Sequence, residues 1–203
     1  MSSPFDLKRL LEPPTETARL SLEVARAWCE PALVNHCLRS WVWAKTLGDS
    51  LGLTVDDELL FVAAMLHDLG VTDPFDAHVM PFESSGGAAA WTFAAGAGWA
   101  PARRDRVREV IERHMWLSVD AEEDPEGFLL ETATSLDVAH AGPEKWDAAL
   151  RRDVTALLPR LDFGSEFADA IGAQASRKPS STAARLHASD RIARGAAAWR
   201  AES

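Results

Sequence analysis

Apolar residues recur every three to four positions along most of the chain, and this spacing limits the fold more than any other feature. It places apolar side chains on one face of a helix. Strand-like runs of Val, Ile and Thr that alternate with polar residues are missing, and Tyr does not occur. We therefore predict an all-α protein. The expected helices span about 15–29, 31 to 48 or 51, 57–69, 85–97, 102–116, 127–140, 144–158, 165–175 and 182–199.

Proline, capping residues and glycine mark several helix boundaries. Pro31 stands where it favours the first turn of a helix. The segment 54–57 resembles a capping box that opens the next helix, and Gly70 is expected to close that helix. A chain of 203 residues is expected to form one domain, here 1–203.

The candidate functional residues fall within about 31–141 of this domain. The helices within about 144–199 carry no motif, and their amphipathic pattern predicts packing on the core. Packing on a second subunit is the alternative, so a homo-oligomer stays open.

The charge balance and the two cysteines restrict partners and compartment. The chain carries 31 acidic and 21 basic residues, a net charge of −10, which argues against nucleic-acid binding through a basic surface. No apolar run approaches the roughly 20 residues of a membrane span, and Met1–Lys8 lacks the pattern of a signal peptide. Cys29 and Cys37 lie two turns apart, which suits free thiols better than a disulfide. We expect a cytoplasmic protein without nucleic-acid or membrane partners.

The sharpest local feature is an apolar helix that runs into His67 and Asp68, followed by Gly70. A carboxylate next to core residues is costly unless it is paired or binds a cation. The negative end of the helix dipole adds to that cost. A bound metal ion would remove the conflict, whereas the simpler alternative is a solvated last turn of the helix.

Two further segments carry comparable residues. His36 lies among apolar neighbours on the helix that begins at Pro31, where it is either a core histidine or a ligand. Asp137 lies between Leu136 and Val138 on a later helix, and its alternative is an exposed edge position. Taken together, His36, His67, Asp68 and Asp137 supply two imidazoles and two carboxylates, a nitrogen and oxygen ligand set that suits a divalent metal. We expect one ion per chain, zinc first, with iron or manganese as alternatives.

The ordered set of His36, His67-Asp68 and Asp137 resembles the signature of the HD superfamily of metal-dependent hydrolases. The resemblance covers roughly residues 31–141. It implies an all-helical HD bundle with the metal site in a core cleft.

A narrower resemblance is to cyanamide hydratase-like HD proteins. It lies in the stretches 35–41 (NHCLRSW), 66–72 (LHDLGVT) and 82–88 (FESSGGA), and in the pair Arg113-His114. Cys37, Trp41 and Val71 depart from that family's pattern, and one extra residue separates Glu83 from the following Gly-Ala pair. These departures fall around the expected pocket, so the substrate need not be cyanamide.

Several residues near the ligands are candidates for catalysis beside Asp68. His114 fits substrate contact, a second metal ligand or core packing, and His78 is another histidine for a second metal. Glu83 is either a general base or a carboxylate that is stabilised by the helix dipole at the start of its helix. Asp73 fits a general base or a turn residue before Pro74.

Arg39, Trp43 and Trp116 are the expected substrate-binding residues, with a structural ion pair as the alternative for Arg39. The narrower resemblance implies that metal-bound water attacks a small nitrile-like or amide-like substrate. The alternatives are a phosphohydrolase acting on a nucleotide or other phosphomonoester, and a non-catalytic metal-binding module. Aromatic surroundings and few nearby cations favour a small substrate that is not a nucleotide.

Overall fold

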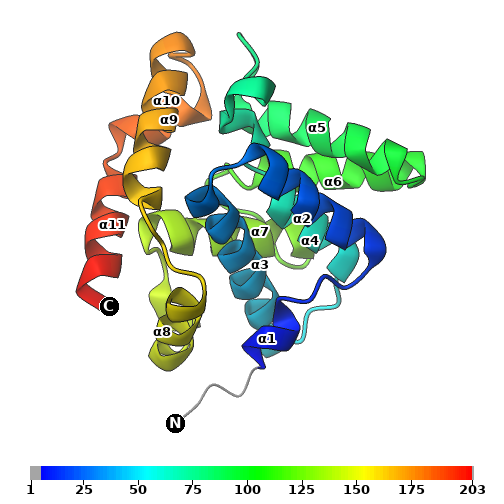
Figure 1. Cartoon of the computed structure of the whole chain (residues 1–203), viewed down its shortest axis with the longest axis horizontal. Helices are drawn as coiled ribbons and strands as arrows, with labels where there is room; N and C mark the ends of the chain where they lie inside the picture. Colours follow the sequence, from blue (N-terminus) through cyan, green and yellow to red (C-terminus); the bar gives the residue numbers. More distant parts are fainter. Residues whose placement is uncertain (1–5, 203) are drawn as a thin grey trace.

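The computed structural model describes residues 6–202 and confirms the all-α prediction, because this part of the chain contains helices and no strand (Figure 1). The expectations for Met1–Lys8 fall mainly on residues outside the described part. No helix among residues 6–202 is both long enough and apolar enough to cross a membrane. The α-helices are α1 Leu7–Leu10, α2 Glu16–Trp28, α3 Pro31–Leu51, α4 Asp57–Leu66, α5 Phe82–Gly96, α6 Pro101–Arg113, α7 Pro125–Ala139, α8 Ala148–Leu157, α9 Phe163–Arg177, α10 Thr182–Ala188 and α11 Arg191–Glu202. Three short 3-10 helices are η1 Leu69–Val71, η2 Asp73–Phe75 and η3 Pro143–Lys145.

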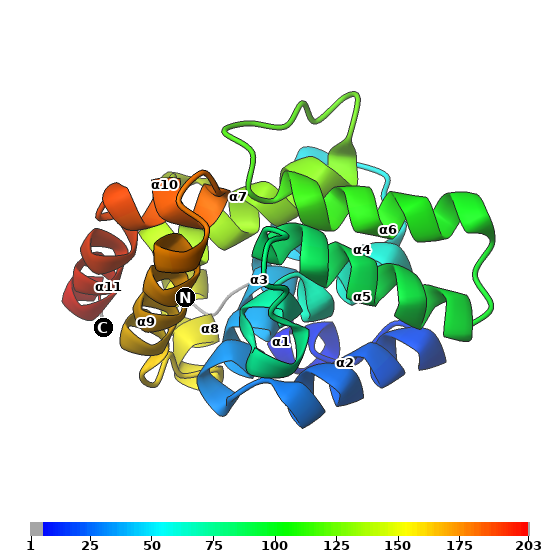
Figure 2. The same cartoon turned by 90° about the horizontal axis from the view of Figure 1, so that it is seen from above.

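Helix α3 runs through the middle of the bundle and packs against α2, α4 and α7. Helices α5 and α6 lie side by side at one end, and α9, α10 and α11 gather at the other (Figure 2). Every residue of α4 from Leu59 to Leu66 is buried, so α4 is a core helix that ends directly at His67. The candidate motifs of α3, α4 and α7 therefore meet inside the bundle.

The helix starts follow the expected capping chemistry, with one change of residue. Thr15 caps α2 through a hydrogen bond from the Ala18 amide. Pro31 occupies the first turn of α3, as predicted. The cap of α4 is Asp56, whose Oδ1 accepts from the Leu59 amide at 3.0 Å, so Thr54 does not open this helix.

Gly70 has a different role from the one predicted. Helix α4 ends at Leu66, and Gly70 lies within the following 3-10 helix. A Cβ at position 70 would lie 2.0 Å from the backbone oxygen of Phe82. Glycine is therefore needed for the close approach of η1 to the start of α5, which fixes the chain immediately after His67 and Asp68.

Two predicted helices are divided in the structure, and one was missed. The predicted helix 144–158 consists of η3 and then α8, which begins after the capping carboxylate of Asp147. The predicted helix 182–199 is broken at Asp190, whose φ of 54° lies in the left-handed region. Helix α1 has only four residues, too few for a periodic pattern to indicate it.

The close approach at Gly70 gives a stability prediction. Replacement of Gly70 by Ala should lower the free energy of unfolding by about 1–3 kcal/mol, the usual cost of overpacking, because the methyl group meets backbone rather than a movable side chain. Gly96→Ala is the matched control, since a Cβ there meets nothing within 4 Å. Urea denaturation of both variants measures the effect, and equal stabilities would contradict the steric explanation.

Candidate metal centre

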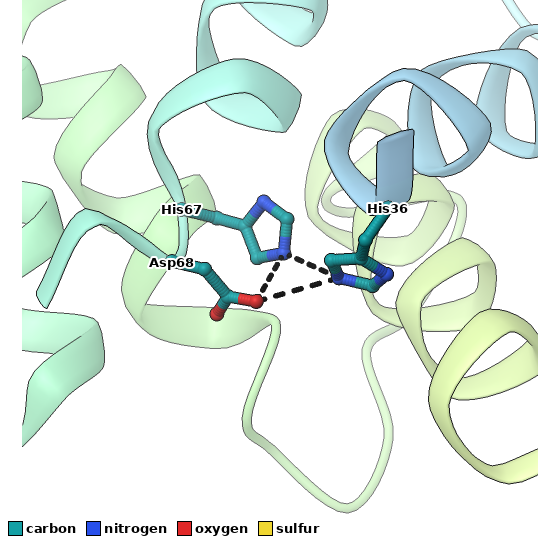
Figure 3. A group of neighbouring side chains, drawn as sticks. All are labelled: His36, His67 and Asp68. Atoms are coloured by element: carbon teal, nitrogen blue, oxygen red, sulfur yellow. Dashed lines mark hydrogen bonds and ion pairs between the residues drawn. The ribbon is translucent and has the colours of Figure 1, made fainter. Parts of the chain in front are cut away.

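His36, His67 and Asp68 converge at one point inside the bundle (Figure 3). Their ligand atoms all lie within 4.8 Å of one another. The two Nε2 atoms are 3.1 Å apart, and Asp68 Oδ2 lies 3.4 Å from His36 Nε2 and 3.2 Å from His67 Nε2. His36 comes from the second turn of α3, while His67 and Asp68 follow the last turn of α4.

The Nδ1 atoms of His36 and His67, which face away from the shared point, already form hydrogen bonds. His36 Nδ1 donates to Asp137 Oδ2 at 2.7 Å, and His67 Nδ1 donates to the carbonyl oxygen of Ala64 at 2.9 Å. These partners are acceptors, so both Nδ1 atoms carry hydrogen, and in the neutral rings both Nε2 lone pairs face the shared point. Two such lone pairs beside a carboxylate repel one another unless a cation lies between them.

The chemistry of Asp68 fits the same conclusion. Asp68 is 1% exposed, yet neither of its carboxylate oxygens has a hydrogen-bond partner. Burial opposes its ionisation, but positive charge on protonated His67 and His36 outweighs burial and holds the pKa of Asp68 below its usual range. A buried, ionised and unbonded carboxylate next to two imidazole nitrogens is a donor set that a divalent metal would satisfy.

Asp137, the fourth expected ligand, does not join this group. Its Oδ2 contacts His36 at Nδ1, the nitrogen on the opposite side of the ring from the shared point. Both carboxylate oxygens are further bonded by Arg39, and Oδ1 also accepts from Trp43 and Arg160. Burial acts against ionisation, but Arg39 and Arg160 hold the pKa of Asp137 well below its usual range. In this geometry Asp137 orients His36, and the expected four-residue ligand set is reduced to three.

Arg39 and Trp43 also differ from expectation, because neither lines the pocket at the three ligands. Arg39 is completely buried and binds Asp137 through Nε and Nη2, both at 2.8 Å. Trp43 is completely buried as well, and its ring stacks on Trp199. The sequence placed Arg39 on the same helical face as His36, but its side chain extends behind the histidine. Arg39 thus forms the structural ion pair given as its alternative, and the partner is Asp137.

His114 lies beside the cluster. Its ring centroid is 5.0 Å from that of His67, and its Nε2 is 3.8 Å from Asp68 Oδ1. Its Nδ1 donates to the carbonyl of Ile111, which leaves the Nε2 lone pair directed toward the site. Burial and the neighbouring His67 lower the pKa of His114 to about 4, so the ring is neutral near pH 7.

Glu83 and Asp73 lie outside the cluster. Glu83 is buried in the first turn of α5, where Oε1 accepts from the Thr182 hydroxyl at 2.6 Å and Oε2 has no partner. Burial raises the pKa of Glu83. Asp73 is exposed and lines a different cavity, together with Trp28, so the structure gives it no place at the metal centre. His78 is likewise exposed and lines a third cavity.

A pocket of about 60 Å³ opens onto the three ligands. Trp116, predicted to contact substrate, lines it and is 56% exposed. The remaining wall is formed by His114, Met115, Thr134, Ser135, Val138, Ala139, Phe167, Leu186 and Arg191. No sequence pattern indicated that the last three, which come from α9, α10 and α11, lie at the site. Phe163 was missed as well, although it stacks on His36 with ring centroids 4.4 Å apart. These residues carry no motif, and only their tertiary packing brings them to the site.

The geometry agrees with the comparisons to known proteins. The family model of the HD domain matches residues 33–137. Cyanamide hydratase DDI2 and cyanamide hydratase DDI3 from Saccharomyces cerevisiae are each 30% identical to this chain over 171 residues, which span 82% of this chain and 76% of each relative. The chain belongs to the HD-domain family.

The unpaired carboxylate makes metal content a direct test of the centre. We expect Asp68→Ala to abolish binding of one divalent ion per chain and to leave the helical circular dichroism unchanged, because the core is built from apolar side chains. Asp73→Ala is the matched control and should retain the metal. Equal metal content in both variants, measured by elemental analysis, would contradict the proposed centre. Loss of helical signal in Asp68→Ala would make the site structural.

His114 gives a pH prediction for the metal-free protein. Its folded pKa is lowered to about 4 from an ordinary 6.5, so between these values the unfolded chain binds a proton that the folded chain does not. The contribution of His114 to the free energy of unfolding is therefore complete above about pH 6.5. It falls by roughly 3 kcal/mol as the pH drops to 4.

The measurement is the free energy of unfolding in urea of wild type and His114→Asn across that range. Asn can replace the hydrogen bond from Nδ1 without titrating. The stability advantage of the wild type over the variant should shrink with falling pH. A difference that is independent of pH would show that His114 is not held neutral.

Proposed function

We propose that the chain is a metal-dependent HD enzyme that adds water across the carbon–nitrogen triple bond of a small, uncharged nitrile of the cyanamide type. The observation that carries the proposal is the convergence of three donor atoms on a pocket of only about 60 Å³. Sites for drug-sized ligands occupy about 300–1,000 Å³, so this pocket suits a substrate of a few heavy atoms. The cyanamide hydratases of yeast that resemble the chain support the same choice.

His36, His67 and Asp68 would hold the ion, and zinc suits this ligand set, with iron or manganese as alternatives. A divalent ion at such a site lowers the pKa of water toward neutrality and polarises an electrophile. The Nδ1 bonds to Asp137 and Ala64 fix which nitrogen each histidine presents.

His114 is the proposed proton carrier. Its neutral Nε2 faces the pocket and accepts a proton from the attacking water, and the resulting imidazolium returns it to the nitrogen of the substrate. The atoms balance, since one water adds to cyanamide to give isourea, which becomes urea when its hydroxyl proton moves to the nitrogen. Glu83 has a partner in Thr182 and does not line the pocket, so we assign it no proton transfer in this scheme.

The walls of the pocket favour an uncharged substrate over a phosphomonoester. Phosphate recognition uses several cationic or bidentate partners. Arg191 is the one arginine or lysine among the pocket residues in the described part of the chain, because Arg39 is committed to Asp137 behind His36. The phosphohydrolase is therefore the weaker candidate. We propose a cytoplasmic location on the basis of the buried free thiols of Cys29 and Cys37.

The test is turnover by the metal-loaded protein. We expect formation of urea from cyanamide, loss of this activity in Asp68→Ala, and no phosphate release from a panel of nucleoside monophosphates. Phosphate release without cyanamide hydration would replace the proposal by the phosphohydrolase. No turnover of either class by protein that contains metal would favour the non-catalytic module.

Trp116 tests the pocket within the same assay. Trp116→Ala should raise KM for cyanamide and leave the metal content unchanged, because the ring forms part of the wall and contributes no ligand. Trp28→Ala removes a similarly exposed ring, 49% exposed, from a different cavity and is the matched control. Equal KM values for the two variants would remove Trp116 from the binding site.

A further inference from the structure

We infer that a second cavity, formed by α8, α9 and α11, binds a small-molecule oxyanion. The cavity has a volume of about 600 Å³, within the range of small-molecule sites. Its lining residues come from α8, α9, α11 and the segment between α8 and α9. These helices lie on the same side of the bundle (Figure 1). Its charged lining residues are Arg152, Arg160, Arg200 and Asp162.

The charge of this cavity is opposite to that of the whole chain. The chain carries a net charge of −10, yet three guanidinium groups and one carboxylate line the cavity. Arg152 and Arg200 are exposed, and their side chains form no hydrogen bond or ion pair with residues 6–202. Arginines without partners at one cavity leave donors available for an anion.

Arg160 adds a partly buried charge at the inner wall. Its Nη1 donates to Asp137 Oδ1 at 3.1 Å and its Nη2 donates to the Asp137 carbonyl at 2.9 Å. Arg39 binds the same carboxylate, so a single negative charge faces two guanidinium groups. The remaining N–H groups of Arg160 have no acceptor in the described part of the chain. An oxyanion would neutralise this excess positive charge and accept hydrogen bonds from the remaining N–H groups of Arg160.

The cavity and the metal centre lie on opposite sides of Asp137. Arg160 contacts Asp137, and Asp137 contacts His36 at the nitrogen that faces away from His67 and Asp68. An anion bound to Arg160 would therefore occupy a site separate from the metal. The ring of Trp199 also lines the cavity, so the preferred class is a phosphate or carboxylate group on a small organic body.

Calorimetric titration of the metal-loaded protein with inorganic phosphate, and separately with citrate, tests the inference. We expect saturable binding of at least one of them. Arg152→Ala/Arg200→Ala should weaken this binding by about tenfold or more, since a hydrogen bond to a charged group contributes about 1.5–3 kcal/mol. Lys8→Ala/Arg26→Ala is the matched control, because it removes two exposed cations that do not line the cavity, and it should change the affinity by less than about twofold.

Asp68→Ala separates this site from the metal centre and should retain the anion affinity. The inference is overturned by absence of saturable binding of both probes at millimolar concentration. It is also overturned by equal weakening in the two double variants, or by loss of binding in Asp68→Ala, which would place the anion on the metal. Circular dichroism of each variant shows that it is folded.

Discussion

The buried carboxylate of Asp137 is the interaction on which the arrangement of the bundle and of its metal centre depends. Removing a carboxylate from water costs several kcal/mol, and only excellent hydrogen bonding offsets that cost. Here Arg39, Trp43 and Arg160 donate to its oxygens, and His36 donates from the centre itself. These partners lie on α3 and on the segment between α8 and α9, while Asp137 belongs to α7. One ionised group therefore links three parts of the chain that lie far apart in sequence.

The link to His36 determines what the histidine can bind. A carboxylate behind Nδ1 fixes the proton there and leaves Nε2 as the ligand atom, and the Ala64 carbonyl does the same for His67. With both rings neutral, two lone pairs meet 3.1 Å apart beside an unbonded carboxylate. This arrangement requires a positive charge at the shared point, supplied by a proton or by a metal ion. The hydrogen bonds to Asp137 and Ala64 thus orient the two histidines, and no hydrogen-bond donor of the described residues satisfies the Asp68 carboxylate between them.

The sequence predicted much of the fold and part of the site, and the differences have physical causes. Helical spacing and caps located most helices, and the apolar context of His67 and Asp68 indicated a buried cation site. Sequence spacing does not reveal which ring nitrogen of His36 faces which partner, so Asp137 was expected as a ligand rather than as a support. Arg39 was expected to bind substrate because it shares a helical face with His36, and sequence spacing does not reveal that its side chain is committed to Asp137. Gly70 was read as a helix stop because a close backbone approach leaves no local pattern.

The pocket wall separates the residues that would hold an ion from those that shape the space above it. His36, His67 and Asp68 all lie within residues 33–137, the part that matches the HD family. Phe167, Leu186 and Arg191 lie beyond that part and close the pocket from α9, α10 and α11. Substitutions in these C-terminal helices change the space and charge above the ligands without changing the ligands themselves. The shape and charge of the pocket should therefore vary with α9–α11, while the capacity to hold the ion depends on α3, α4 and the carboxylate of α7.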